Sequence, residues 1–427
     1  MSMAGARDSV LFEPLRIGKL EVGGRVFKAA TTETLASKDG FVTDELLAFY
    51  EPLAYAGTPL IVTGGLNVNA QGKMFDCSGA IDADDKVPGL RRLTETVHRY
   101  DSAIFAQLGH CGRQVFPREV GLESALSASP VREIAMGTKP RAMTHDEIRQ
   151  TVADFAAAAG RAQEAGFDGV EILAGVGYLL SAFLTPHTNR RKDQYGGSLS
   201  NRMRFLLEVL RTIRERVGDE FPVIAKLNGT DALPGRKGMT TGELLEVGSA
   251  LEVEGLDGVE ITAGHYESGG VAGQGKWDGF YRVMVKEGRM TRGLPRWRQR
   301  ALLLASPVFT LVSNHRWPPE EGFLLSYARQ FKARLGIPVI SVGGFLSKGA
   351  MEGAIESEQC DAVAVARAMV ADPLLYKHLR HGNRGPACDF CMGCAARVGY
   401  SPVGCYNPQV GAERAAMLAA EGLQPSS

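Results

Sequence analysis

The sequence predicts an α/β fold class, a (β/α)8 TIM barrel, and three observations support this prediction. Short apolar, β-branched runs alternate eight times with amphipathic stretches along the 427 residues. Most of these runs end at a Gly, a Thr or an Arg. The runs are continuously apolar, which is typical of strands buried on both faces of a parallel sheet. Eight such units favour a closed barrel over a doubly wound sheet.

Each unit begins with a strand, and a helix follows it. The strands are expected at 25–32, 59–65, 103–110, 169–175, 222–229, 258–264, 338–344 and 362–367. The clearest helices between them are expected at 43–56, 88–100, 145–165, 201–217, 240–254 and 323–335. The helix over 145–165 has apolar residues at i, i+3 and i+4. Thr144 and Glu147 resemble a capping box at its start.

The composition is that of an ordinary globular protein with 44% hydrophobic residues, 48 basic residues and 48 acidic residues. Zero net charge argues against a disordered chain and against a nucleic-acid binder with a strong basic field. No run of 18 apolar residues occurs, and the N-terminus lacks an apolar core flanked by basic residues. We therefore expect no membrane span, no signal peptide and a cytoplasmic location.

Four of the seven cysteines lie close together near the C-terminus, at Cys388, Cys391, Cys394 and Cys405. Clustering at Cys-x2-Cys spacing indicates metal ligation in a reducing compartment more than a disulfide framework. Three closely spaced thiolates and a remote fourth suit a [4Fe–4S] cluster. Four thiolates also suit a tetrahedral zinc ion. A third interpretation is a remnant that holds no metal.

The barrel places chemistry at the C-terminal ends of its strands. The polar or backbone-exposing residues expected there are Thr31, Thr32, Gly64, Gln107, His110, Lys226, Asn228, His265, Gly343, Gly344 and Arg367. Any one of them alone fits a simple rim-capping role. Buried Lys and Arg side chains need an anionic partner, because unpaired burial of a charge is costly.

The last two strand ends have the features of a phosphate site. Gly343 and Gly344 offer bare backbone N–H groups, and Arg367 offers a bidentate clamp. Lys226 is placed to neutralise an anionic ring, and Gln107 can both donate to and accept from a ring edge. Phosphate, ring edge and cation together describe a site for flavin mononucleotide, FMN.

Several motifs resemble the Old Yellow Enzyme family of NAD(P)H:flavin oxidoreductases. The most specific is the 26-residue run 177–202, and the segment 107–113 resembles the flavin-contacting segment. Shorter similar segments are 29–32, 226–228, 342–345 and 367–373, and the matches keep their order over about 10–270 and 320–410. The resemblance implies one FMN-binding barrel domain over 1–410, with the Cys cluster at 388–405, followed by a tail over 411–427.

The resemblance also implies roles for single residues. Tyr178 matches the family's proton-donating tyrosine, and NAD(P)H is the implied reductant. The implied reaction is hydride transfer from reduced FMN to an activated C=C bond, in a small apolar or acyl-type substrate. The FMN-contacting positions implied are Ala30, Thr31, Thr32, Gly64, Gln107, Lys226, Gly343, Gly344, Ala366 and Arg367. Ala366 stands where Gly is common in the family.

Two positions depart from the family pattern. Leu173 and Val176 stand where many members hold the substrate carbonyl with a His and a second His or Asn. This resembles the branch of 2,4-dienoyl-CoA reductase and trimethylamine dehydrogenase, and the cysteine spacing resembles the cluster site of that branch. His265 is the candidate replacement for polarising the carbonyl or moving a proton, and a rim histidine bonded to backbone is the alternative.

A second hypothesis is therefore an FMN/[4Fe–4S] dehydrogenase or demethylase that passes electrons to a carrier protein. Relatives with a cluster usually carry a dinucleotide-binding half after the barrel, and we expect none in this sequence, which ends at Ser427. Electrons are then expected to move through the FMN pocket or through a partner protein.

Residues 271–319 form an insertion between the sixth and seventh strands. It contains all three Trp residues, and eight basic but only two acidic residues lie between Lys276 and Arg300. Three interpretations are a lid over a large apolar or anionic substrate, a contact with an anionic membrane, and a helical hairpin packed on the barrel. Pro307 is expected to break the apolar run 301–312, which argues against one long helix.

Overall fold

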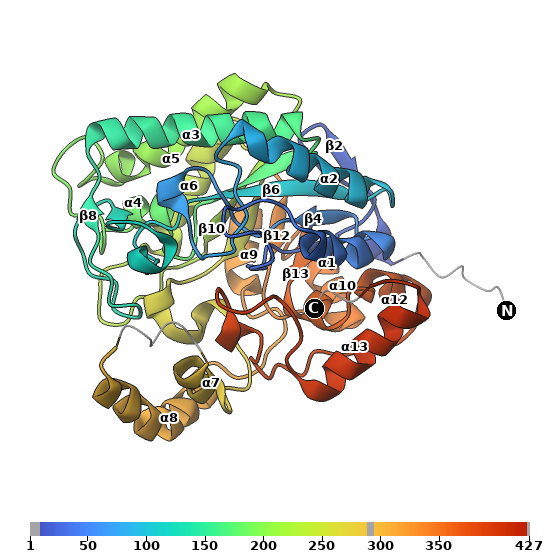
Figure 1. Cartoon of the computed structure of the whole chain (residues 1–427). Coiled ribbons are helices and arrows are strands. Elements are labelled where there is room, and N and C mark those ends of the chain that lie inside the picture. The colour runs from blue at the N-terminus through green and yellow to red at the C-terminus, as the bar shows by residue number, and fades with distance from the viewer. Residues whose placement is uncertain (1–8, 288–293, 425–427) are drawn as a thin grey trace.

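The computed structural model describes residues 9–287 and 294–424. Its central feature is a closed ring of eight parallel strands (Figure 1), which confirms the predicted barrel. The ring closes because β4 pairs with both β3 and β6. In chain order the strands are β3 (Val26–Lys28), β4 (Leu60–Val62), β6 (Ala103–Gly109), β9 (Gly169–Leu173), β10 (Val223–Asn228), β11 (Gly258–Thr262), β12 (Val339–Ser341) and β13 (Ala362–Val365).

Helices surround the ring, and all six helices predicted by range are present. They are α1 (Asp44–Tyr55), α2 (Val87–His98), α3 (His145–Glu164), α5 (Leu199–Val217), α6 (Thr241–Val253) and α9 (Leu325–Lys332). The Thr144–Glu147 capping box at the start of α3 is confirmed. Further helices are α4 (Leu179–Leu184), α7 (Phe280–Lys286), α8 (Arg296–Arg316), α10 (Lys348–Glu356), α11 (Arg367–Ala371), α12 (Leu375–His381) and α13 (Pro408–Ala420).

An apolar plug closes the N-terminal end of the barrel. Strands β1 (Leu15–Ile17) and β2 (Leu20–Val22) form a hairpin before the first barrel strand. Ile17 and Val22 of this hairpin pack with inward-facing residues such as Phe27, Phe105 and Ile224. The remaining apolar core lies between the strands and the helices. The open end for chemistry is therefore the C-terminal one, as the barrel rule predicts.

Three aspartates, Asp168, Asp257 and Asp361, stabilise strand starts in the same way. Each accepts a hydrogen bond from the main-chain N–H at or near the start of the neighbouring barrel strand, at 2.8 Å from Ile104 and Val223 and 2.9 Å from Val339. Each also pairs with a basic side chain on a helix, and these side chains are His98, Arg214 and Lys332. We call these residues the strand-start aspartates.

The insertion 271–319 forms a helical hairpin of α7 and α8 at the edge of the molecule (Figure 1). The expected break at Pro307 is wrong, because α8 runs through it. Proline cannot donate to the carbonyl of Leu303, and the Ser306 hydroxyl donates to that carbonyl instead, at 2.7 Å. Trp277 Nε1 donates to the carbonyl of Trp317 at 3.0 Å, which ties the two ends of the hairpin together.

None of the helices in the described part of the chain is long and apolar enough to cross a membrane.

Candidate functional site

Four neighbouring strands carry a buried polar network at the C-terminal half of the barrel. Gln107 on β6 donates to Glu171 on β9, and Lys226 on β10 lies 3.6 Å from the same carboxylate. Lys226 also donates to Glu260 on β11. Burial lowers the pKa of Lys226, and Glu171 opposes this shift. The carboxylates of Glu171 on β9 and Glu260 on β11 thus supply the anionic partners that a buried Lys226 requires.

Sequence reasoning missed Glu171 and Glu260. Their signal was a repeat, because the pentapeptide Asp-Gly-Val-Glu-Ile occurs at 168–172 and again at 257–261. Both glutamates are buried at 0–1% exposure, inside otherwise apolar strands. A carboxylate there is tolerated only with a cationic or hydrogen-bonding partner, so the repeat predicts a buried network.

Asn228 connects the next layer of the site. Its side-chain carbonyl accepts from the main-chain N–H of Val176 at 2.9 Å, and its amide donates to Asp231 at 2.9 Å. His265 Nε2 lies 3.1 Å from the Asp231 carboxylate, and its ring is buried. Burial raises the pKa of Asp231, but the interactions with His265 together with the hydrogen bonds from Met239 and Asn228 outweigh it and lower the pKa. His265 thus lies against a carboxylate, and its proposed catalytic role stays a prediction.

Tyr178 and Tyr266 form a hydroxyl pair with their oxygens 2.8 Å apart. Their rings meet edge to face at 5.9 Å between centroids. Burial raises the pKa of Tyr178 well above its ordinary value, and the neighbouring Tyr266 raises it further. Burial also raises the pKa of Tyr266. Both hydroxyls therefore keep their protons at neutral pH. Tyr266 was not singled out from the sequence.

The tyrosine pair borders an apolar cluster. Tyr178 packs with Met74, Cys111, Val115 and Leu173. Leu173 and Val176, the two positions that depart from the family pattern, both contribute to this cluster. The site therefore combines one pair of phenolic donors with an apolar surface. Such a combination suits an apolar substrate with a single hydrogen-bonding group.

A buried ion cluster fixes the segment beside the pair. Glu267 pairs with Arg113, lies 3.5 Å from His187 and lies 3.3 Å from Arg236. Burial opposes ionisation of Glu267, but its bonds to His187 and Arg113 lower its pKa to about 2. Gln114 accepts from the main-chain N–H of Tyr266 at 3.2 Å. These contacts join the strand ends of β6 and β11 around the tyrosines.

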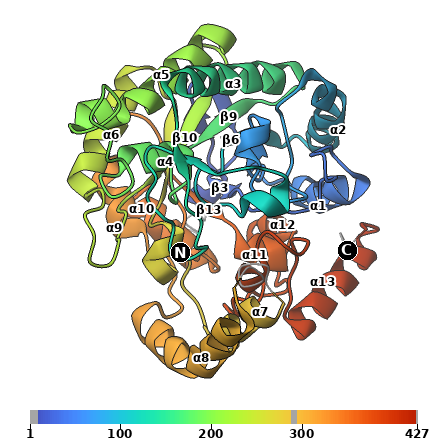
Figure 2. The ribbon, with the colours of Figure 1, turned by 60° about the vertical axis from the view of Figure 1, so that its left-hand side comes forward.

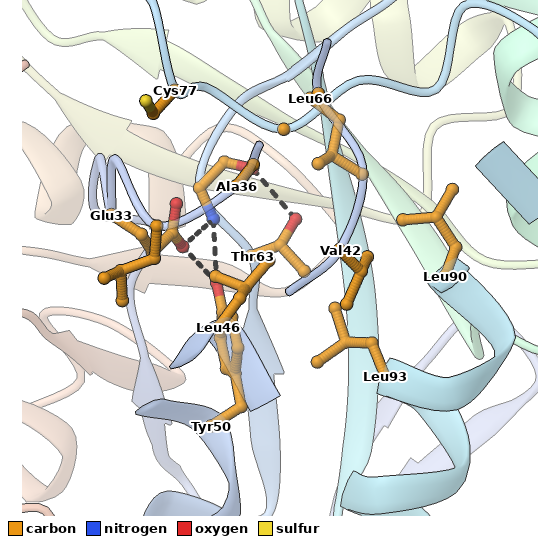
Figure 3. Close-up of a pocket in the computed structure, with 14 residues that line it drawn as sticks. Glu33, Ala36, Val42, Leu46, Tyr50, Thr63, Leu66, Cys77, Leu90 and Leu93 are labelled. Carbon is orange, nitrogen blue, oxygen red and sulfur yellow. Dashed lines mark hydrogen bonds between the residues drawn. The ribbon is translucent and has the colours of Figure 1, made fainter. Parts of the chain in front are cut away.

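The first two strand ends lie close to one another. Thr31 accepts from the ammonium of Lys28 at 2.9 Å, and Ala30 and Thr32 beside it are half-buried. The N–H of Gly64 donates to Glu33 at 2.6 Å and to the hydroxyl of Tyr50 at 3.1 Å (Figure 3). A Cβ on Gly64 would lie 1.9 Å from the Glu33 carboxylate, so this position accepts only glycine.

A cavity of about 10 Å³ lies behind this contact, between α1, α2 and the end of β4. Leu46, Tyr50, Leu90 and Leu93 line it (Figure 3). This volume has room for about one water molecule. The cavity is therefore a packing feature and holds no organic ligand.

The last two strand ends have the glycine and arginine that a phosphate needs. Gly343 has φ +142° and Gly344 has φ +76°, and both turns follow β12. The guanidinium of Arg367 lies 5.2 Å from the Phe390 ring, and it contacts the Met392 sulfur at 3.0 Å. Arg367 forms no ion pair within the described residues. Glycine turns that expose main-chain N–H groups, together with an arginine that has no carboxylate partner among the described residues, fit a phosphate group.

The residues at the barrel end therefore fit an FMN. Gln107 and Lys226 would meet the ring, and Gly343, Gly344 and Arg367 would meet the phosphate. Ala366, just before Arg367, packs against the inner barrel core. The individual cofactor contacts stay predictions.

The four cysteines at 388–405 lie in one region, and the charge of Cys388 affects the pKa of each of the other three. Burial raises the pKa of Cys391 and Cys394 to about 11. Among residues 9–287 and 294–424, no three His, Cys, Asp or Glu side chains are grouped closely enough to hold a metal ion. The thiols as arranged do not fit a cluster, and the predicted metal site stays a prediction.

Comparison with known proteins identifies the family. Residues 10–286 match the NADH:flavin oxidoreductase / NADH oxidase family. The chain belongs to this family. A multifunctional alkene reductase/demethylase of Caballeronia cordobensis is 29% identical, over 96% of this chain and 54% of that protein. The predicted resemblance to the Old Yellow Enzyme family is therefore confirmed.

Two further relatives differ in their length. A 4,4'-dithiodibutanoate disulfide reductase of Rhodococcus erythropolis is 32% identical, over 93% of this chain and 94% of that protein. An NADH oxidase of Thermoanaerobacter brockii is 33% identical, over 90% of this chain but 53% of that protein. The chain spans about half the length of the NADH oxidase and all but a small part of the disulfide reductase.

Solved structures share the fold. A 2-naphthoyl-CoA reductase in complex with 2-naphthoyl-CoA is 27% identical with a TM-score of 0.79, over 95% of this chain and 58% of that chain. A morphinone reductase in complex with tetrahydroNAD is 25% identical with a TM-score of 0.66, over 88% of this chain and 91% of that chain.

Proposed function

We propose that the protein is an FMN-dependent NAD(P)H oxidoreductase that reduces an activated C=C bond, with Tyr178 as proton donor. The single observation that carries the proposal is the Tyr178–Tyr266 hydroxyl pair beside an apolar cluster at the barrel end. Bound FMN supplies the hydride chemistry. Family membership and the glycine–arginine strand ends support this cofactor.

The chain's own residues have separate tasks in this reaction. Tyr178 delivers a proton to the carbon that does not receive hydride, and its hydroxyl, 2.8 Å from that of Tyr266, can be reprotonated through this fixed partner. Gln107 and Lys226 are held by the carboxylates of Glu171 and Glu260. This network fixes the direction of both side chains where the ring of the cofactor would lie.

The substrate class follows from the same surroundings. Leu173 and Val176 cannot hold a carbonyl or thioester oxygen by a hydrogen bond, so Tyr266 and the candidate replacement His265 are the remaining donors beside Tyr178. The apolar cluster around Leu173 and Cys111 favours an apolar or acyl-type molecule. The 2-naphthoyl-CoA bound by one structural relative belongs to this class. A disulfide is a further substrate to test, because a relative of matching length is a disulfide reductase.

The test separates the two half-reactions. Tyr178→Phe removes the proton donor but leaves the ring, so flavin reduction by NAD(P)H should keep its rate. Reoxidation by an α,β-unsaturated thioester or enone should slow by about 10²-fold to 10⁴-fold. Both rates are measured by anaerobic stopped-flow absorbance of the flavin.

Tyr195→Phe is the matched control, since Tyr195 is also buried and its hydroxyl meets Glu208 at 2.9 Å outside the site. It should leave both rates unchanged. Equal alkene reduction by the wild type and Tyr178→Phe would remove Tyr178 from the mechanism.

The second candidate is a dehydrogenase or demethylase that passes electrons to a carrier protein. A relative that is a multifunctional alkene reductase/demethylase, 29% identical over 96% of this chain, favours it. Iron and acid-labile sulfide are measured on anaerobically purified protein. About four iron atoms per chain favour this candidate, and flavin without iron favours the single-site reductase.

A further inference from the structure

Helix α8 (Arg296–Arg316) carries an apolar stripe on its exposed side. The exposed fractions are 83% for Leu304, 72% for Leu311, 66% for Trp297, 62% for Val308 and 52% for Val312. At about 100° per residue, these five side chains fall within an arc of about 100°. With a rise of about 1.5 Å per residue, the stripe is about 22 Å long. Large apolar side chains gathered in this way mark an interaction surface.

Basic residues border the stripe on both edges. At the same helical spacing, Arg296 and Arg300 lie along one edge, and Arg298 and Arg316 lie along the other. No residue of α8 is acidic. Within the part of the chain that the structure describes, none of the four arginines forms an ion pair. The chain as a whole has zero net charge, whereas α8 alone carries four arginines and no acidic residue.

The helix stands at the periphery of the molecule. In Figures 1 and 2, α7 and α8 lie together at the edge opposite α3 and α5, outside the ring of helices around the barrel. The side of α8 opposite the stripe faces α7, since Ser313 is buried and its hydroxyl lies 2.6 Å from the Tyr281 hydroxyl of α7. The stripe therefore points away from α7, although Leu311 at its edge also lines a hollow between α7 and α8 with Asp278 and Arg282.

We propose that α8 docks the protein on an anionic lipid surface, lying in the plane of the interface with its apolar stripe inserted. A continuous helix with a Trp-containing and Leu-containing face and arginines on both edges is the pattern of an interfacial helix. The sequence predicted a break at Pro307, whereas α8 is continuous through this residue. The inference does not depend on the reaction proposed for the barrel.

Charge decides against the other occupants. Two copies paired through α8 would bring arginines on one stripe against arginines on the other, with no acidic residue on the helix to compensate. An acidic protein would meet the arginines but would also have to cover an exposed apolar stripe about 22 Å long. An anionic membrane satisfies the arginines with headgroups and the stripe with acyl chains.

The full-length flavoprotein is tested by sedimentation with vesicles of phosphatidylcholine, alone or mixed with phosphatidylserine. We expect binding to the mixed vesicles, weak binding to phosphatidylcholine alone, and release at high salt. The double change Leu304→Glu and Leu311→Glu should weaken binding at least tenfold. Replacing Arg296 and Arg300 by Gln should weaken it about fivefold for each arginine removed.

The matched control is Val253→Glu, because Val253 is 84% exposed on α6 and lies outside the hairpin. It should bind vesicles like the wild type. Flavin content and circular dichroism show that each variant is folded. Absence of binding to mixed vesicles at low salt, or equal binding to both vesicle types, overturns the proposal. So does self-association that Leu304→Glu abolishes in a protein that ignores vesicles.

Discussion

Two consecutive left-handed residues precede Tyr178 and determine where its ring can lie. Val176 has φ +57° and Gly177 has φ +81°. A β-branched residue in this region is strained by about 1–3 kcal/mol, and such strain persists only when its surroundings enforce it. Here the Asn228 carbonyl accepts from the N–H of Val176 at 2.9 Å, and Gln114 donates to the carbonyl of Val176 at 2.8 Å.

Gly177→Ala tests this arrangement. The new Cβ would lie 2.7 Å from His265 Nδ1 and 2.9 Å from Gln114 Oε1, in a backbone conformation that L-residues rarely adopt. We expect a Tm lower by several degrees and alkene reduction slower by at least tenfold, with flavin content retained. Val176→Gly is the paired control, and it should raise the Tm because glycine relieves the strain. A Gly177→Ala enzyme with normal turnover would contradict this role.

At the level of residues, the sequence named candidates where a side chain lies in a recognisable motif and missed those that do not. The motif around Gly177 drew attention to Tyr178, whereas Tyr266 became visible only through its contact at 2.8 Å. The buried glutamates Glu171 and Glu260 were missed because their only signal in the sequence is the repeated pentapeptide, and not a hydrophobic periodicity. Partners across strands depend on barrel register, which one sequence does not contain.

At the scale of elements, the strand-start aspartates repeat one device around the barrel. Each carboxylate accepts from a neighbouring strand and pairs with a basic helix side chain, so that one side chain joins three elements. For Asp257 the partners are the N–H of Val223 and the guanidinium of Arg214. Along the chain, consecutive parallel strands are connected only by crossover helices. Contacts between a strand start and a neighbouring helix therefore help to fix strand order and register.

Asp257→Ala should destabilise the fold without touching the site. Loss of the hydrogen bond leaves the N–H of Val223 without its partner, and Arg214 loses its carboxylate. We expect a decrease of about 2 kcal/mol in the free energy of unfolding. Urea unfolding followed by circular dichroism measures it. Asp219→Ala, on a loop with an exposed side chain, is the control and should change little. Equal midpoints for both variants would show that the device does not stabilise the barrel.

Strands and regular helices could be predicted because their pattern is local. All eight barrel strands lie within or close to the expected ranges, since each is short, apolar and followed by a turn residue. The continuity of α8 was not predicted, because Pro307 lacks the N–H that would donate to the Leu303 carbonyl. The Ser306 hydroxyl donates to that carbonyl instead. A rule that treats proline as a break does not include this compensation.

At the scale of the whole molecule, acid stability depends on a neutral histidine at the barrel end. His110 is 1% exposed, and its Nδ1 accepts from the N–H of Gly112 at 3.0 Å, which requires an unprotonated Nδ1. Burial lowers the pKa of His110 to about 3, from an ordinary value of 6.5. Between pH 6.5 and pH 3, His110 is protonated in the unfolded chain but stays neutral in the folded chain.

The stability contributed by neutral His110 is therefore complete above pH 6.5 and is lost as the pH falls toward 3. Between pH 6.5 and pH 5 the loss is about 2 kcal/mol. His110→Gln keeps an acceptor for Gly112 but cannot be protonated, so its Tm should fall by a few degrees less than that of the wild type between pH 7 and pH 5. Thermal unfolding at both pH values, with matched flavin loading, measures the difference. Parallel decreases in Tm would mean that groups other than His110 control the acid response between pH 7 and pH 5. The comparison of wild type and variant thus assigns acid lability either to the barrel end or to the fold around it.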